Sequence, residues 1–142
     1  MTEAPPPQRR PLETAPFTDW MEVHEVKGDG RQFCLQVRQR KELCNRHGVV
    51  HGGAVATLLD SAMARAARSM SGVGEIAGTV DIQVQFLQPA SGLLTAIGHV
   101  EHASKSLAFC RGEVRNEAGE AVALASATMK LRRAFSSAGH QG

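Results

Sequence analysis

The stretch Asn45-Arg-His-Gly-Val-Val-His51-Gly52-Gly53-Ala-Val-Ala-Thr-Leu-Leu-Asp60 decides the fold of this chain. A polar loop ends on a histidine and two glycines, and an apolar helix begins at once. Glycine at a helix start lets a ligand approach free backbone N–H groups, which carry the positive end of the helix dipole. Asp60 places a carboxylate among small apolar side chains, where an ionised group is costly to bury unless it is paired or used in chemistry. An electrophile-binding helix end and a lone carboxylate together indicate hydrolysis of an acyl compound.

The helix is expected to run from about Gly53 to Met70, with Gly72 as its C-terminal stop. Its apolar positions recur at helical spacing, namely Val55, Leu58, Leu59, Ala62, Met63 and Ala66. Alanines flank Asp60 on a second face, so the helix is apolar almost all round and is expected to be buried.

Segments with a strand-like pattern precede and follow this helix in the sequence. A short apolar helix is expected to start at Pro16-Phe17, followed by strands over 21–27, 31–38, 79–87, 93–103, 106–116 and 121–132. Residues 79–87 alternate, which predicts Val80, Ile82, Val84 and Phe86 on one face and Thr79, Asp81, Gln83 and Gln85 on the other. Turns are expected at Lys27–Gly30, at Pro89–Gly92 and at Asn116–Gly119.

The expected inner faces of the later strands carry unusually small residues, which let a helix lie close. They are Ala96, Gly98, Ala108, Cys110, Gly112, Ala121, Ala123, Ala125 and Ala127. A helix of about 18 residues spans ~27 Å, which matches strands of eight to ten residues. We therefore expect an α+β fold in which an antiparallel sheet of five to six strands wraps one long central helix. Residues 16–133 form this domain, and residues 1–15 and 134–142 are expected to be disordered tails.

Composition excludes several classes of function. The 142 residues carry a formal charge of only +2 and 4% aromatic residues with no tyrosine, so nucleic-acid binding is not expected. No apolar run is long enough to cross a bilayer, and three cysteines without metal-type spacing indicate reduced thiols in a cytoplasmic protein. Cys44, His47 and His51 lack a fourth ligand at recognisable spacing, and His99 and His102 are expected on different strand faces, so no metal site is expected.

The order of elements resembles that of the hot-dog fold thioesterases, specifically the phenylacetate-pathway (PaaI-like) type of acyl-CoA thioesterase. The resemblance covers roughly residues 16–133 and rests on the Pro16-Phe17 start, the Asn45-to-Asp60 segment, the Gly78–Asp81 block and the Phe86–Ala90 block. It implies a thioester site lined by Asn45, His51, Gly52, Asp60 and Thr79. It implies no cofactor, since coenzyme A enters only as part of the substrate.

The residues at these positions suit thioester hydrolysis. The Gly52 N–H can stabilise the developing oxyanion. Asp60 can activate water as a general base, or it can attack directly and form an anhydride, and the sequence does not separate these routes. Thr79 is expected to position the water or hold the carboxylate. Asn45 is expected to bind the thioester carbonyl or steady the loop, and His51 to orient either of them.

The spacing of Gly52 and Asp60 predicts a shared site. Eight residues apart in one helix, they lie ~12 Å apart along its axis, so one carbonyl cannot contact both. If both act in one reaction, two antiparallel helices must place Gly52 of one chain near Asp60 of another. The resemblance implies this homodimer and its pairing into a tetramer, with Asn45, His51 and Gly52 from one subunit and Asp60 and Thr79 from its neighbour.

The coenzyme A phosphates call for cations near the site. Lys105 and Arg111, with Ser106 next to Lys105, are the better candidates, although these two could equally be solvated charges. Arg132 and Arg133 are the weaker candidates. Gly53 and Pro89 lie within the matched motifs and are expected to contact the substrate.

Three alternatives remain open from the sequence. Asp60 could be a structural carboxylate paired with Arg65, Arg68 or a backbone group. The chain could bind acyl-CoA without cleaving it, as a sensor or scaffold, although a binder has no need of a carboxylate beside a thioester. The chain could also be a hot-dog hydratase or dehydratase, although those enzymes use a histidine and a helix acid at a different spacing, which this sequence does not have. The acyl group itself cannot be read from the sequence.

Overall fold

The computed structural model describes residues 15–26 and 32–133, so the expected Lys27–Gly30 turn and nearly all of both expected tails lie outside the described residues. The elements are α1 (Pro16–Trp20), β1 (His24–Val26), β2 (Phe33–Arg38), the 3-10 turn η2 (Lys41–Leu43), α2 (Gly52–Arg68), β3 (Val73–Phe86), β4 (Leu93–Ala103), β5 (Leu107–Arg115) and β6 (Ala121–Arg133). One long helix and six strands confirm the expected hot-dog arrangement. The first strand was expected over 21–27 but is only three residues long, and α2 ends at Arg68 rather than Met70.

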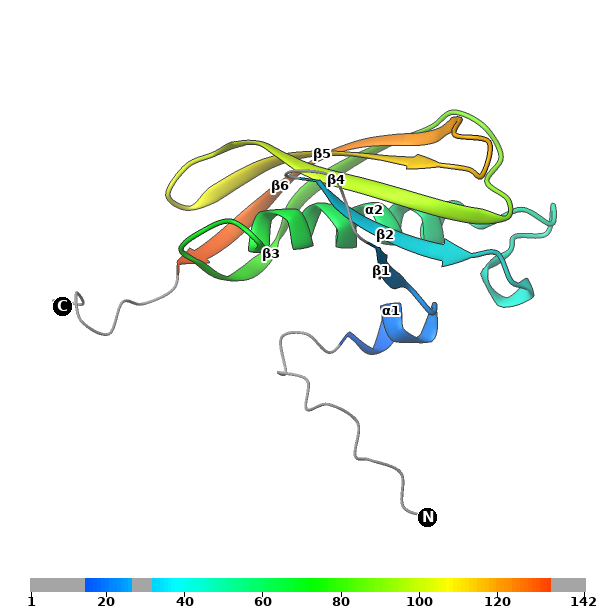
Figure 1. Cartoon of the computed structure of the whole chain (residues 1–142), viewed down its shortest axis with the longest axis horizontal. Coiled ribbons are helices and arrows are strands. Elements are labelled where there is room, and N and C mark those ends of the chain that lie inside the picture. The colour runs from blue at the N-terminus through cyan, green and yellow to red at the C-terminus, as the bar shows by residue number, and fades with distance from the viewer. Residues whose placement is uncertain (1–14, 27–31, 134–142) are drawn as a thin grey trace, which may run out of the picture.

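All neighbouring strands of the single sheet are antiparallel, in the order β1-β2-β4-β5-β6-β3. Figure 1 shows this sheet arching over α2, with α1 below the helix in that view. β1 and β3 are the two edge strands. β3 is 14 residues long and pairs only with β6, so its other side has no partner among the described residues.

Small side chains on the sheet allow α2 to lie close to it, as expected. The inward positions include the buried Ala96, Ala108, Cys110, Ala123 and Ala127. At Gly98, an added Cβ would lie 2.6 Å from the backbone carbonyl carbon of Ala62 on α2, which leaves room only for glycine. Because the backbone of α2 lies against the sheet at this point, the sheet fixes the distance between α2 and the strands, and with it the position of the site residues on α2.

β3 differs from its expectation in length and in register. It begins at Val73, six residues before the expected start, in a stretch whose two glycines hide any alternation. A β-bulge between Thr79 and Asp81 makes Val80 an extra residue. The expected face is therefore wrong for Thr79, whose side chain lies on the α2 side of the sheet. Ile82, Val84 and Phe86 lie on the same side, where they pair with Ala127, Ala125 and Ala123.

A bulge in β4 also changes the placement of two histidines. His99 pairs with Arg111 and His102 pairs with Phe109, both on the outer face of the sheet, with the register shift between them. The expectation that the two histidines lie on different faces is wrong, because Glu101 is the extra residue of the bulge. Among the described residues, no group of three or more possible metal ligands is found.

The three cysteines are unpaired, and burial raises the pKa of Cys34 and raises that of Cys110 to about 11. None of the helices in the described part of the chain is long and apolar enough to cross a membrane.

Candidate active site

The start of α2 is shaped by His51, whose side chain caps the helix. Its Nδ1 atom accepts a hydrogen bond of 2.8 Å from the Gly53 N–H, and its carbonyl accepts from the N–H of Ala54. A Cβ at Gly53 would lie 3.0 Å from this Nδ1, so glycine there makes room for the cap. His51 was expected to orient its neighbours, and in this chain the histidine side chain organises the helix start itself.

Gly52 is the first residue of α2, and its N–H has no hydrogen-bond acceptor among the described residues. This is the donor that the helix dipole makes most attractive to a developing negative charge. The Phe86 ring lies over it, 3.3 Å from where a Cβ at Gly52 would be. A pocket of about 300 Å³ opens here, lined among others by Asn45, Gly52, Phe86 and Pro89.

Asn45 holds the loop that leads into this pocket. Its Oδ1 accepts from the His47 N–H at 2.9 Å, and its carbonyl accepts from the Gly48 N–H, so residues 45–48 form a tight turn. Its side-chain NH₂ group has no acceptor within the described residues. Of the two roles expected for Asn45, the loop contact is present, and the free NH₂ group leaves the second role available.

Asp60 and Thr79 form the other part of the site. The Thr79 hydroxyl donates a hydrogen bond of 2.7 Å to Asp60 Oδ1, which is the carboxylate-holding role expected for Thr79. Asp60 is half-buried, and none of the ion pairs formed among the described residues includes it. Arg65 instead lies 3.7 Å from Glu25, so the structural pairing with Arg65 is not formed.

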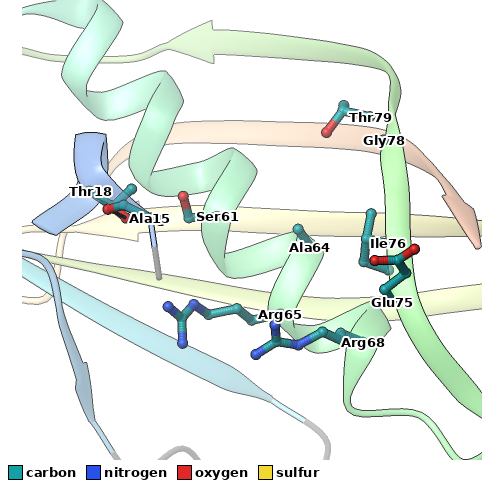
Figure 2. A pocket seen from close by; sticks show the side chains of 10 residues that line it. All are labelled: Ala15, Thr18, Ser61, Ala64, Arg65, Arg68, Glu75, Ile76, Gly78 and Thr79. Carbon is teal, nitrogen blue, oxygen red and sulfur yellow. Dashed lines mark hydrogen bonds between the residues drawn. The ribbon is translucent and has the colours of Figure 1, made fainter. Parts of the chain in front are cut away.

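A pocket of about 260 Å³ adjoins Thr79 between α1, α2 and β3 (Figure 2). Ser61, Ala64, Arg65 and Arg68 line it from α2, and Ile76 and Gly78 line it from β3. This pocket was not predicted from the sequence. The sequence did contain an indication of this pocket, because residues 61, 64, 65 and 68 fall at helical spacing on α2 and are polar or small.

The site residues therefore fall into two groups at different positions along α2. Asn45, Gly52 and Pro89 surround the helix start, whereas Asp60 and Thr79 lie two turns further on, ~12 Å along the axis. Each group holds half of what an acyl transfer needs: an anion-binding N–H in one and a carboxylate with a hydroxyl partner in the other.

The residues expected to bind coenzyme A lie apart from both groups. Lys105 and Ser106 are in the turn between β4 and β5, which is at the end of the sheet near the C-terminus of α2. Arg111 is on the outer face of the sheet, 3.6 Å from Glu101, with an exposed side chain. Their contact with coenzyme A stays a prediction.

The two weaker candidates have structural partners. Arg133 donates to the backbone carbonyls of Lys105, Ser104 and Ser71, and so ties two turns together. Arg132 forms an ion pair with Glu75 on β3.

Known proteins share this fold. The family model of the thioesterase superfamily matches residues 47–123. No curated protein sequence matches the chain significantly. The chain resembles the solved structure of a protein from the thioesterase superfamily at 27% identity and a TM-score of 0.77, over 85% of this chain and 92% of that one.

Two further structures are similar. One is the Escherichia coli PaaI protein from the phenylacetic acid degradation operon, at 23% identity and a TM-score of 0.76, covering 84% of this chain and 86% of that one. The other is a mutant of the phenylacetic acid degradation protein PaaI from Thermus thermophilus, at 23% identity and a TM-score of 0.72, covering 82% of this chain and 98% of that one.

Proposed function

Because the chain belongs to the thioesterase superfamily, we propose that it hydrolyses acyl-CoA thioesters to a free acid and coenzyme A. The observation that carries this proposal is that the chain has both an unbonded N–H at Gly52 and, elsewhere on α2, a carboxylate at Asp60 that the Thr79 hydroxyl holds. An oxyanion donor and a water-activating group suffice for this reaction, because a thiol with a pKa of about 8.5 leaves without a general acid.

The two groups act together only across two chains, so the active species is a homodimer. The long edge strand β3 supports this arrangement, because Val80 and Phe86 expose 58% and 57% of their surfaces along an edge that has no partner strand among the described residues. Long apolar edges of this kind invite pairing with another strand. Pairing of β3 with its copy sets two α2 helices antiparallel, with Gly52 of one facing Asp60 of the other. Pairing of dimers into a tetramer stays a prediction.

In the general-base route, Asp60 takes a proton from water as the water oxygen bonds to the thioester carbon. The carbonyl oxygen becomes an oxyanion, which the Gly52 N–H stabilises. The C–S bond then breaks, coenzyme A leaves as a thiolate, and the proton passes to the thiolate. In the covalent route, Asp60 attacks the same carbon, the thiolate leaves, and water cleaves the resulting anhydride. Trapping of the anhydride with hydroxylamine distinguishes the two routes.

The substrate is expected to bind along two pockets, the one at the start of α2 and the one beside Thr79. We assign Gly53 and Pro89 to the wall around the thioester, and Lys105, Ser106 and Arg111 to the phosphates of coenzyme A. Phosphate recognition by these cations predicts a rise in KM at high salt.

The test is thiol release from a panel of acyl-CoAs by the wild-type protein and by Asp60→Ala and Asp60→Asn. We expect a loss of kcat of at least ~10²-fold in both variants. Asp81→Asn is the matched control, because Asp81 is an exposed carboxylate of the same strand as Thr79 on the outer face of the sheet. Unchanged turnover in the Asp60 variants would remove this carboxylate from the mechanism, and binding without turnover by every protein would favour a sensor.

A further inference from the structure

His51 sets the direction of the oxyanion donor through the peptide group that it shares with Gly52. The His51 carbonyl accepts hydrogen bonds from the N–H groups of Ala54 at 2.9 Å and Val55 at 3.2 Å, both in the first turn of α2. The C=O and N–H groups of one trans peptide point in opposite directions. Because this carbonyl points into the helix, the Gly52 N–H points out of the helix end, where none of the described residues accepts a hydrogen bond from it.

The capping hydrogen bond holds the first turn of α2 in place. The Gly53 N–H donates to His51 Nδ1 at 2.8 Å, so this second N–H of the helix is occupied while that of Gly52 stays available. The His51 backbone is anchored as well, because its N–H donates to the Leu43 carbonyl at 2.8 Å. Loss of the cap would free the Gly53 N–H and loosen the first turn, since an uncapped helix end frays. The cap therefore keeps the direction of the Gly52 N–H constant.

The cap also sets the tautomer of the His51 ring. A backbone N–H only donates, so the Nδ1 atom that accepts from Gly53 carries no hydrogen, and the hydrogen of the neutral ring is on Nε2. Nε2 then has no lone pair for a further proton, and Nδ1 can take one only if the cap breaks. The described residues that line the pocket at Gly52 do not include His51. His51 therefore has no nitrogen available as a general base, and proton transfer from water is left to Asp60.

We infer that His51 is a positioning residue, which acts on the reaction only through its Nδ1 cap by orienting the Gly52 N–H, and which takes no part in proton transfer. This inference rests on the proposed thioesterase function, because it concerns the oxyanion donor of the same site. An asparagine side chain places its Oδ1 atom as many bonds from Cα as Nδ1 is, and asparagine is a favoured N-cap residue. A glutamine side chain places its amide nitrogen as far out as Nε2 and is one bond too long for the same cap.

The experiment compares acyl-CoA hydrolysis by His51→Asn, which keeps a cap acceptor and loses the distal nitrogen, with hydrolysis by His51→Gln, which does the reverse. We expect kcat of His51→Gln to fall about tenfold with KM nearly unchanged, because the lost cap loosens the donor without removing a substrate contact. Rescue by the cap-forming side chain should keep kcat of His51→Asn within about threefold of the wild-type value. His47→Gln is the matched control, because His47 is an exposed histidine of the same loop whose side chain forms no hydrogen bond with the described residues.

Two kinetic results overturn the inference. A loss in His51→Asn as large as that in His51→Gln would give the distal nitrogen a role in the reaction, and wild-type kcat in both variants would show that the cap does not orient the donor. Nitrogen NMR of the neutral His51 ring, assigned by the signals missing from His51→Asn, measures the tautomer without turnover. We expect a hydrogen on Nε2 alone, and a hydrogen on Nδ1 would contradict the cap. If the wild-type protein cleaves no acyl-CoA, the proposed function fails, and the NMR measurement still tests the cap.

Discussion

Substitution of Gly98 by alanine tests the close contact between the sheet and α2. The new Cβ would lie 2.6 Å from the carbonyl carbon and oxygen of Ala62 and 2.8 Å from the Met63 nitrogen. These are backbone atoms, so no rotamer change relieves the overlap, and α2 must shift to restore ordinary contact. Overpacking of a core costs about 1–3 kcal/mol, and we expect the upper end because backbone meets backbone.

The assay is thermal and urea unfolding. A loss of about 3 kcal/mol should lower Tm by roughly 8–15 °C in a domain of this size, with a lower urea midpoint and an unchanged m-value. Gly78→Ala is the matched control, because the same added methyl group meets no atom within 4 Å there. If Gly98→Ala unfolds at the same temperature as Gly78→Ala, the helix does not rest on the sheet at this point.

Three further changes give distinct outcomes. Thr79→Val removes the hydroxyl that bonds to Asp60 and should lower kcat/KM roughly tenfold, whereas Thr79→Ser should keep most of it; equal activity of both variants would contradict the role of the hydroxyl. Gly52→Pro removes the free N–H at a helix position that accepts proline, and should be ~10²–10³-fold slower than Gly52→Ala, which adds the same Cβ beside Phe86 but keeps the N–H. Burial raises the pKa of Cys110 from 9.0 to about 11, so the folded state holds this proton more tightly than the unfolded state; stability should fall as the pH rises from 9 to 11, and Cys110→Ala should flatten that fall in urea unfolding.

Periodicity predicted most of the fold. The run of apolar positions after Gly53 gave the helix to within two residues at its C-terminus, and the strand over 93–103 has the expected ends. The β-bulges could not be read from the sequence, because an alternating pattern carries no information about an extra residue in one strand. This is why Thr79 and the histidines of β4 were placed on the wrong faces.

The candidate site was predictable in its residues but not in all of its contacts. Thr79 was expected to position the water or hold the carboxylate, but the spacing of the two residues alone gave no sign of a direct hydrogen bond, because that contact depends on the bulge between Thr79 and Asp81 in β3. The capping role of His51 depends on a side-chain torsion that spacing does not set. The coenzyme A contacts, the oligomeric state and the expected cytoplasmic location stay predictions.

The most direct test of the shared site is the activity of a mixed dimer. Gly52→Pro and Asp60→Ala chains, co-expressed with different affinity tags and purified through both, give a dimer in which each chain lacks a different half of the site. If the oxyanion donor and the carboxylate come from different chains, one of two sites is intact, and the mixed dimer should show about half the wild-type kcat. If the mixed dimer is no more active than the two variants alone, the site does not straddle two chains.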